Sequence, residues 1–118
     1  MSILDRFFPK DNLIQKTVEI DSLLFDKVEY LSQNVYDASI SKIINACIDE
    51  LIFNKKIELY EKNKNEISLK HTIVIREISL KGLENLKENY DISINKLINI
   101  AIYKVLKEEK PAKSVKVI

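Results

Sequence analysis

Two short segments of the chain alternate apolar and polar residues, the pattern of a β-strand that buries one of its faces. In residues 15–20 the inward positions are Val18 and Ile20, and in residues 70–75 they are Ile73 and Ile75. The opposite faces carry Gln15, Thr17 and Glu19 in the first segment and Lys70, Thr72 and Val74 in the second. Because a lone strand leaves its backbone groups unpaired, we predict that the two segments pair with each other.

Each predicted strand is followed by two stretches whose apolar residues recur at helical spacing. We expect the first helices at about Ser22–Tyr36 and Ser79–Tyr90, and second helices that begin after Ser39 and Ser93, which can cap them. The expected inward residues of the first helices are Leu24, Phe25, Val28, Leu31 and Val35, and then Leu80, Leu83, Leu86 and Tyr90. Those of the second helices are Ile40, Ile43, Ile44, Cys47, Ile48 and Leu51, and then Ile94, Leu97, Ile98, Ala101, Ile102 and Val105. The second helices are apolar around much of their circumference and are expected to form a shared centre.

The same order of elements occurs twice because the sequence contains an internal repeat. Tyr36–Asn45 reads YDASISKIIN and Tyr90–Asn99 reads YDISINKLIN, with seven of ten positions identical at an offset of 90 − 36 = 54. The strand Thr17–Ile20 aligns with Thr72–Ile75 at an offset of 72 − 17 = 55. The predicted organisation is an apolar N-terminal arm (1–14), a first unit (15–53), a linker or helix extension (54–69), a second unit (70–106) and a C-terminal tail (107–118).

The segment between the units decides whether they pair within one chain. Taken as coil it spans up to roughly 50 Å, enough to return to the first strand. Phe53, Ile57 and Tyr60 instead continue a helical spacing, and a helix extended to about Lys62 would leave too few residues to fold back. Two chains would then exchange units. We predict the single-chain arrangement, in which pairing benefits from a high effective concentration, with further self-association left open.

Composition acts mainly by exclusion. The formal net charge is +1, so any binding to nucleic acid must come from a local patch. One glycine excludes a Gly-rich phosphate loop, and one cysteine, Cys47, excludes an internal disulfide. Neither a signal-peptide pattern nor an apolar run of ~20 residues is present, so a cytoplasmic protein that does not bind membranes is expected. No catalytic or metal-ligating cluster recurs, so we expect no enzyme, cofactor or metal site, and a structural role for His71.

Both ends of the chain carry apolar residues with no place in the repeat. Ile3, Leu4, Phe7 and Phe8 are spaced like one helix face, and this arm either covers the core or docks on another protein. Pro111 is expected to end the last helix. Beyond it, a tail with alternating apolar residues either adds as a strand to a partner or stays disordered. The candidate partner-binding residues are Phe7, Phe8, Val115 and Val117.

The order strand, helix, polar turn and helix with a serine-rich start resembles the ribbon-helix-helix family of bacterial DNA-binding proteins, which includes the Arc, MetJ and CopG repressors. The matching residues are the two strands and the turns Asp37–Lys42 and Asp91–Lys96. In the family a glycine usually stands where Asp37 and Asp91 stand here. Two such units in one chain are similar to the TraY type of plasmid-transfer accessory protein.

This resemblance implies a mainly α-helical tandem pseudo-dimer with a short two-stranded antiparallel β-ribbon, whose outward side chains enter the DNA major groove. Carried over, the base-contacting candidates are Gln15, Thr17, Glu19, Lys70, Thr72 and Val74. The candidates for phosphate contact are Ser39, Ser41, Lys42, Ser93, Asn95 and Lys96. The implied function is sequence-specific binding of double-stranded DNA, for transcriptional repression or for plasmid partition, copy control or transfer, at a site that need not be a palindrome. The alternative is a scaffold that has become a protein interaction module without DNA binding.

Overall fold

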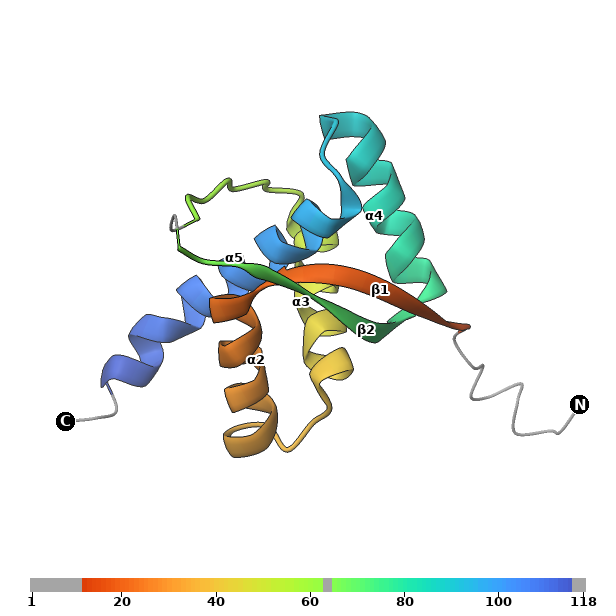
Figure 1. Cartoon of the computed structure of the whole chain (residues 1–118). Helices are drawn as coiled ribbons and strands as arrows, with labels where there is room; N and C mark the ends of the chain where they lie inside the picture. Colours follow the sequence, from red (N-terminus) through yellow and green to blue (C-terminus); the bar gives the residue numbers. More distant parts are fainter. Residues whose placement is uncertain (1–11, 63–64, 116–118) are drawn as a thin grey trace, which may run out of the picture.

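The structure, a computed structural model, describes residues 12–62 and 65–115, with side chains described up to residue 108. Along the chain a strand and two helices are followed by a second strand and two more helices (Figure 1). The elements are β1 (Leu13–Asp21), α2 (Ser22–Asn34), α3 (Ile40–Asn54), β2 (Ser68–Arg76), α4 (Glu77–Tyr90) and α5 (Ile94–Val115). This order and the internal repeat agree.

The two strands pair antiparallel, as a ribbon in which Thr17 lies opposite Thr72. Their inward residues are buried, as the alternation predicted: Val18, Ile20, Ile73 and Ile75 are at most 2% exposed. A further backbone hydrogen bond closes each end of the ribbon. At one end the N–H of Ser22 in α2 donates to the carbonyl oxygen of Ile67, the residue before β2, at 2.9 Å. At the other end the N–H of Glu77 in α4 donates to the carbonyl oxygen of Asn12, the residue before β1, at 2.8 Å. The predicted pairing of the two segments is therefore confirmed within one chain.

The core lies between the ribbon and the second helix of each unit. In Figure 1, α3 and α5 cross behind the ribbon, while α2 and α4 extend from its two ends. Fully buried residues of α3 and α5 include Ile44, Ile48, Ile98 and Ile102. Burying each such side chain contributes roughly 1.5–3 kcal/mol. Ile100 is also fully buried although the apolar stripe did not include it, because α5 is covered around more of its circumference.

Inward positions predicted at the ends of the first helices were wrong. Val35 is 44% exposed and caps α2, which ends at Asn34. Tyr90 is 48% exposed and is the last residue of α4. Both follow the apolar spacing, but each stands at the last turn, where its helix has passed the edge of the core. Leu24, Val28 and Leu31 of α2 and Leu83 and Leu86 of α4 are buried as predicted.

The alternative in which the first unit's second helix extends to Lys62 is not what the structure has. α3 ends at Asn54, and Lys55 caps it in the left-handed conformation with φ 56°. Ile57 and Tyr60 still pack against the core, but from a segment without helical structure. The ring of Tyr60 stacks on Tyr103 with 4.5 Å between ring centroids. The helix-like spacing of these residues reflects contacts of an extended linker.

The one glycine of the chain marks a close approach between helices. A Cβ atom added to Gly82 in α4 would lie 2.5 Å from Cδ1 of Ile52 in α3. Glycine costs a helix interior roughly 1 kcal/mol relative to alanine. That cost is offset here because the missing side chain lets α3 and α4 pack together.

The predicted end of the last helix at Pro111 was wrong, since α5 continues to Val115. Proline lacks an N–H and so removes one helical hydrogen bond, but the turns on either side can still form. Val115 is therefore helical and not part of a strand. Val117 and the arm residues Ile3, Leu4, Phe7 and Phe8 lie outside the described residues.

Candidate functional site

The outward face of the ribbon gathers the six side chains predicted to contact bases. Gln15, Thr17, Glu19, Lys70 and Thr72 are exposed, and Val74 is half-buried. The two central threonines lie opposite each other with their Oγ1 atoms 3.3 Å apart, within hydrogen-bonding distance. Six side chains from strands 55 positions apart thus form one continuous surface, as the alternation of both segments predicted.

The register relates the two halves of this surface by an internal two-fold axis near the central threonines. Glu19 lies opposite Lys70 on one side of the axis, and Gln15 lies opposite Val74 on the other. We call these pairs the charged half and the neutral half. By the repeat, Gln15 is the counterpart of Lys70, and Glu19 is the counterpart of Val74. The backbone is therefore symmetric whereas its side-chain chemistry is not.

The starts of α3 and α5 are capped as predicted. Ser39 Oγ accepts from the backbone N–H of Lys42 at 3.1 Å, and Ser93 Oγ accepts from that of Lys96 at 3.2 Å. Both lysine side chains are exposed. The turns before the caps each contain a residue with positive φ, Asp37 at 47° and Asp91 at 55°. Aspartate tolerates this left-handed conformation better than most residues.

Ser41 and Asn95, predicted to contact phosphate, bind the edges of the ribbon. Ser41 Oγ accepts from the backbone N–H of Val74 at 3.1 Å, and Asn95 Oδ1 accepts from that of Glu19 at 3.3 Å. Each helix start therefore holds the strand of the other unit. Of the six predicted phosphate contacts, Ser41 is half-buried, whereas Ser39, Lys42, Ser93, Asn95 and Lys96 are exposed.

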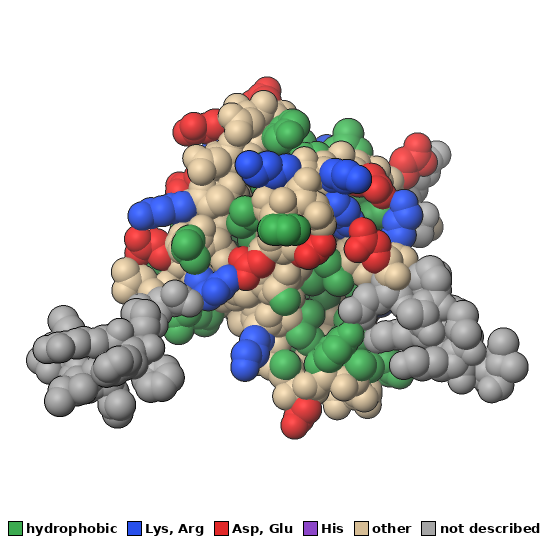
Figure 2. All heavy atoms as spheres, turned by 180° about the vertical axis from the view of Figure 1, so that it is seen from behind, with side chains coloured by type: hydrophobic (Ala, Val, Ile, Leu, Met, Phe, Trp, Pro, Cys, Tyr) green, Lys and Arg blue, Asp and Glu red, His purple; other side chains and the backbone are tan. Residues whose placement is uncertain are grey.

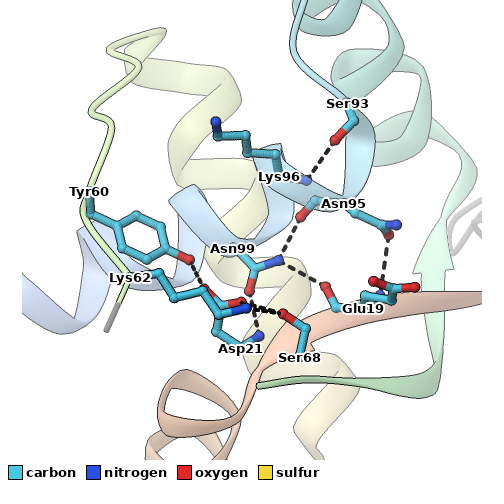
Figure 3. Close-up of a pocket in the computed structure, with 9 residues that line it drawn as sticks. All are labelled: Glu19, Asp21, Tyr60, Lys62, Ser68, Ser93, Asn95, Lys96 and Asn99. Carbon is cyan, nitrogen blue, oxygen red and sulfur yellow. Dashed lines mark hydrogen bonds and ion pairs between the residues drawn. The ribbon is translucent and has the colours of Figure 1, made fainter. Parts of the chain in front are cut away.

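Two asparagines that the sequence analysis missed complete this attachment. Asn99 Nδ2 donates to Glu19 O at 2.9 Å, and its Oδ1 accepts from Asp21 N–H at 2.8 Å (Figure 3). Asn45 does the same on the other strand, donating to Val74 O at 2.7 Å and accepting from Arg76 N–H at 3.2 Å. A carboxamide offers a donor and an acceptor side by side, as a neighbouring strand would. We call these residues the asparagine clamps.

A signal for the clamps was present in the sequence. Asn45 and Asn99 are the last, identical residues of the repeated ten. Each stands directly after the buried apolar residues of its helix, Ile44 and Ile98, so each places a polar amide next to the core. A polar residue kept at the same core-facing position of both units indicates a partner that must be hydrogen-bonded.

A pocket of about 430 Å³ opens beside the charged half, at the start of α5 (Figure 3). Its floor is a polar network around Asp21, which is 7% exposed. Ser68 Oγ donates to Asp21 Oδ1 at 2.6 Å, Tyr60 donates its hydroxyl hydrogen to Oδ2, and Lys62 Nζ lies 3.3 Å from Oδ1. Burial raises the pKa of Asp21, but these bonds outweigh it and hold the pKa below its ordinary 3.8. Burial and the bond to Asp21 raise the pKa of Tyr60.

The opposite end of the ribbon has a different network. There the counterpart of Asp21 is Arg76, whose guanidinium forms an ion pair with Asp49 of α3. Ser79 Oγ donates to the other carboxylate oxygen of Asp49 at 2.7 Å. One end of the ribbon is thus anchored by the linker and the other by α3 and α4.

His71 lies on the inward side of β2, half-buried, with its ring stacked on Phe25 at a centroid distance of 3.6 Å. Its Nε2 atom is buried and has no hydrogen-bond partner in the part of the chain that the structure describes. Neighbouring metal ligands are lacking as well: the described ranges contain no group of three His, Cys, Asp or Glu residues placed to hold a metal ion. Stacking on Phe25 is the contact that positions this ring.

The face opposite to that of Figure 1 shows basic and acidic side chains interspersed, without a large area of one sign (Figure 2). None of the helices within residues 12–62 and 65–115 is long and apolar enough to cross a membrane. Comparisons with known protein families, with curated proteins and with solved structures found no match for this chain.

Proposed function

We propose that this chain binds double-stranded DNA by placing its ribbon in the major groove, as a tandem ribbon-helix-helix protein. The observation that carries the proposal is the register that sets Thr17 opposite Thr72. It joins six outward side chains into one surface and sets a capped helix start on each flank. The major groove is wide enough to admit a two-stranded ribbon, and its base edges carry a distinct donor and acceptor code.

The two helix starts supply the contacts that would fix the ribbon in the groove. The first turn of a helix leaves backbone N–H groups without helical partners, and these bind phosphate oxygens well. Lys42 at the start of α3 and Lys96 at the start of α5 add one exposed positive charge on each side. Such contacts position a protein on the duplex, while base contacts give specificity.

A protein that covers a defined DNA site without an enzymatic group acts by occupying it. Transcriptional repression, or an accessory role in plasmid partition, copy control or transfer, fits this mode of action. The positive φ at Asp37 and Asp91 supports the family assignment, because these are the positions where glycine is usual in ribbon-helix-helix proteins.

One observation favours the second candidate, a protein interaction module built on the same scaffold. The outward ribbon face has no net charge, since Glu19 lies opposite Lys70. Leu13, at the start of β1, is 66% exposed and extends this face with apolar surface. A face of this kind suits a protein partner better than a uniformly basic one would.

The experiment that separates the two candidates removes side chains from the ribbon without disturbing the core. Duplex DNA sites are first selected from a random pool at 100 mM salt, because affinity for DNA depends strongly on salt. Affinity for the selected site is then measured by fluorescence anisotropy for the wild type and for the double variant Lys70→Ala, Thr72→Ala. Both residues are exposed, so the circular dichroism spectrum and the unfolding midpoint should not change.

We expect the double variant to lose affinity by about 5- to 150-fold, which is the range for the loss of one specific base contact. The matched control is Lys87→Ala, which removes the same charge from the far end of α4, away from the ribbon (Figure 1). Its affinity should stay close to that of the wild type. If no sequence is enriched, or if the ribbon variant binds as tightly as the control, the ribbon does not read DNA.

A further inference from the structure

We infer that the two halves of the ribbon read different base pairs, a C·G pair under the charged half and an A·T pair under the neutral half. This inference rests on the proposed function and adds a specificity to it. Its basis is the pairing of unlike side chains on a symmetric backbone: Glu19 opposite Lys70, and Gln15 opposite Val74.

The charged half matches the major-groove edge of one C·G base pair. Guanine presents two acceptors, N7 and O6, which a lysine ammonium can bind, and cytosine presents the N4 amino donor, which a carboxylate can accept. Directly opposed residues of an antiparallel pair have Cβ atoms about 4.5–5.5 Å apart. Lys70 and Glu19 can therefore address the two bases of the same pair. An A·T pair fits less well, because the adenine N6 amino donor would face the lysine, which is also a donor, and the thymine methyl group would face the carboxylate.

The neutral half matches an A·T base pair in the same way. A glutamine carboxamide binds adenine N6 and N7 with two hydrogen bonds, and an apolar side chain contacts the thymine methyl group. Gln15 is exposed and free to extend, while Val74 is half-buried at the edge of the outward face. A C·G pair would place the cytosine amino group, which needs an acceptor, against an apolar side chain.

Glu19 and Val74, which occupy counterpart positions in the two halves, are both held through their backbone groups. Glu19 is bonded through its N–H to Asn95 and through its C=O to Asn99. Val74 is bonded through its N–H to Ser41 and through its C=O to Asn45. Both positions are thus fixed from the second helix of the other unit, so the difference between the halves lies in the side chains.

The separation of the halves sets the spacing of the two base pairs. Gln15 and Glu19 are four residues apart along one strand, or roughly 13 Å at the usual rise. Because base pairs rise about 3.4 Å along the duplex axis, the two read positions are at most about four base pairs apart. The threonine pair at the axis lies midway between these two positions.

The internal symmetry provides a direct test by two substitutions. Because Glu19 is the counterpart of Val74 and Lys70 that of Gln15, the double variant Glu19→Val, Lys70→Gln gives both halves the same side chains. The two substituted residues, Glu19 and Lys70, are exposed on the outward face of the ribbon, so the variant should fold. Sites are selected from random duplex DNA for the wild type and for the variant at the same salt, with circular dichroism confirming the fold of both.

For the wild type we expect a motif with C·G at one read position and A·T at the other, and a loss of about 5- to 150-fold when either pair is exchanged. For Glu19→Val, Lys70→Gln we expect a palindromic motif with A·T at both positions. The inference is overturned, with the proposed function intact, if the wild type selects a palindrome or if the variant keeps the wild-type motif. If the folded wild type enriches no sequence, the proposed function fails and the inference with it.

Discussion

Replacing Asn99 by alanine tests whether the asparagine clamps hold the ribbon on the helices. Asn99 is 7% exposed and satisfies two backbone groups of β1, the N–H of Asp21 and the C=O of Glu19. Removing the amide leaves the buried N–H of Asp21 without its acceptor, and such an orphaned group costs about 1–3 kcal/mol. The carbonyl of Glu19 belongs to an exposed residue and can recover part of its hydration, so its loss is smaller.

The expected total for Asn99→Ala is therefore a decrease of about 2–3 kcal/mol in the free energy of unfolding. A chain of this length has a total stability on the order of 5–15 kcal/mol, so the variant should remain folded and its transition measurable. The assay is urea unfolding followed by circular dichroism, with the change read from the midpoint at constant slope.

Two further variants are compared with Asn99→Ala in the same urea unfolding assay. Asn45→Ala should cost less, about 1–2 kcal/mol, because Asn45 is half-buried and water can replace part of its bonds. Asn85→Ala removes the same side chain from the exposed face of α4 and should stay within about 0.5 kcal/mol of the wild type. If Asn99→Ala is no more destabilising than Asn85→Ala, the clamp is not a source of stability and the reasoning is wrong.

Three other predictions follow from the same structure. Because the pKa of Asp21 is lowered in the folded state, its contribution to stability is present above its ordinary value of 3.8 and is lost as the pH falls through the folded pKa. Urea midpoints between pH 7 and 2.5 should therefore fall less steeply for Asp21→Asn than for the wild type. In a double-mutant cycle, Gly82→Ala should be more favourable by about 1 kcal/mol or more in an Ile52→Ala background than in the wild type, because the overlap with Ile52 Cδ1 is then absent; independent effects would contradict this. If DNA is bound as proposed, Lys42→Ala and Lys96→Ala should each weaken binding to all sequences alike and reduce the slope of log affinity against log salt by about 0.9, and an unchanged slope would remove that lysine from the phosphate contacts.

The parts of the fold that the sequence predicted are those with a local signal. Alternation marked the inward faces of both strands, and the serines before each second helix marked caps that the structure confirms. The internal repeat then predicted that the order strand, helix, helix occurs twice, as it does in the structure. Errors concentrated at helix ends, such as Val35 and Tyr90, because periodicity continues past the point where the core stops covering a helix.

The parts that could not be predicted depend on contacts between the units. Asn99 bonds to Asp21, 78 positions earlier, and its role follows from the strand that happens to lie beside it. The linker network has the same character, since Tyr60 and Lys62 reach Asp21 only after the ribbon has formed. Helical spacing in the linker was misleading for this reason: apolar residues that pack against a core from an extended segment are not distinguished by spacing from those of a helix.

Because both units belong to one chain, the residues at counterpart positions of the ribbon can differ, which is impossible in a dimer of identical chains. With two copies of one unit, any residue placed at position 19 would recur at its counterpart, and the two halves of the ribbon would be the same. Here Glu19 and Val74 occupy counterpart positions with different chemistry, and Asp21 and Arg76 do so at the ribbon ends. The backbone tolerates the difference because the clamps bind main-chain atoms, which do not change with the side chain. Symmetric attachment of the ribbon is therefore what allows its outward surface to be asymmetric.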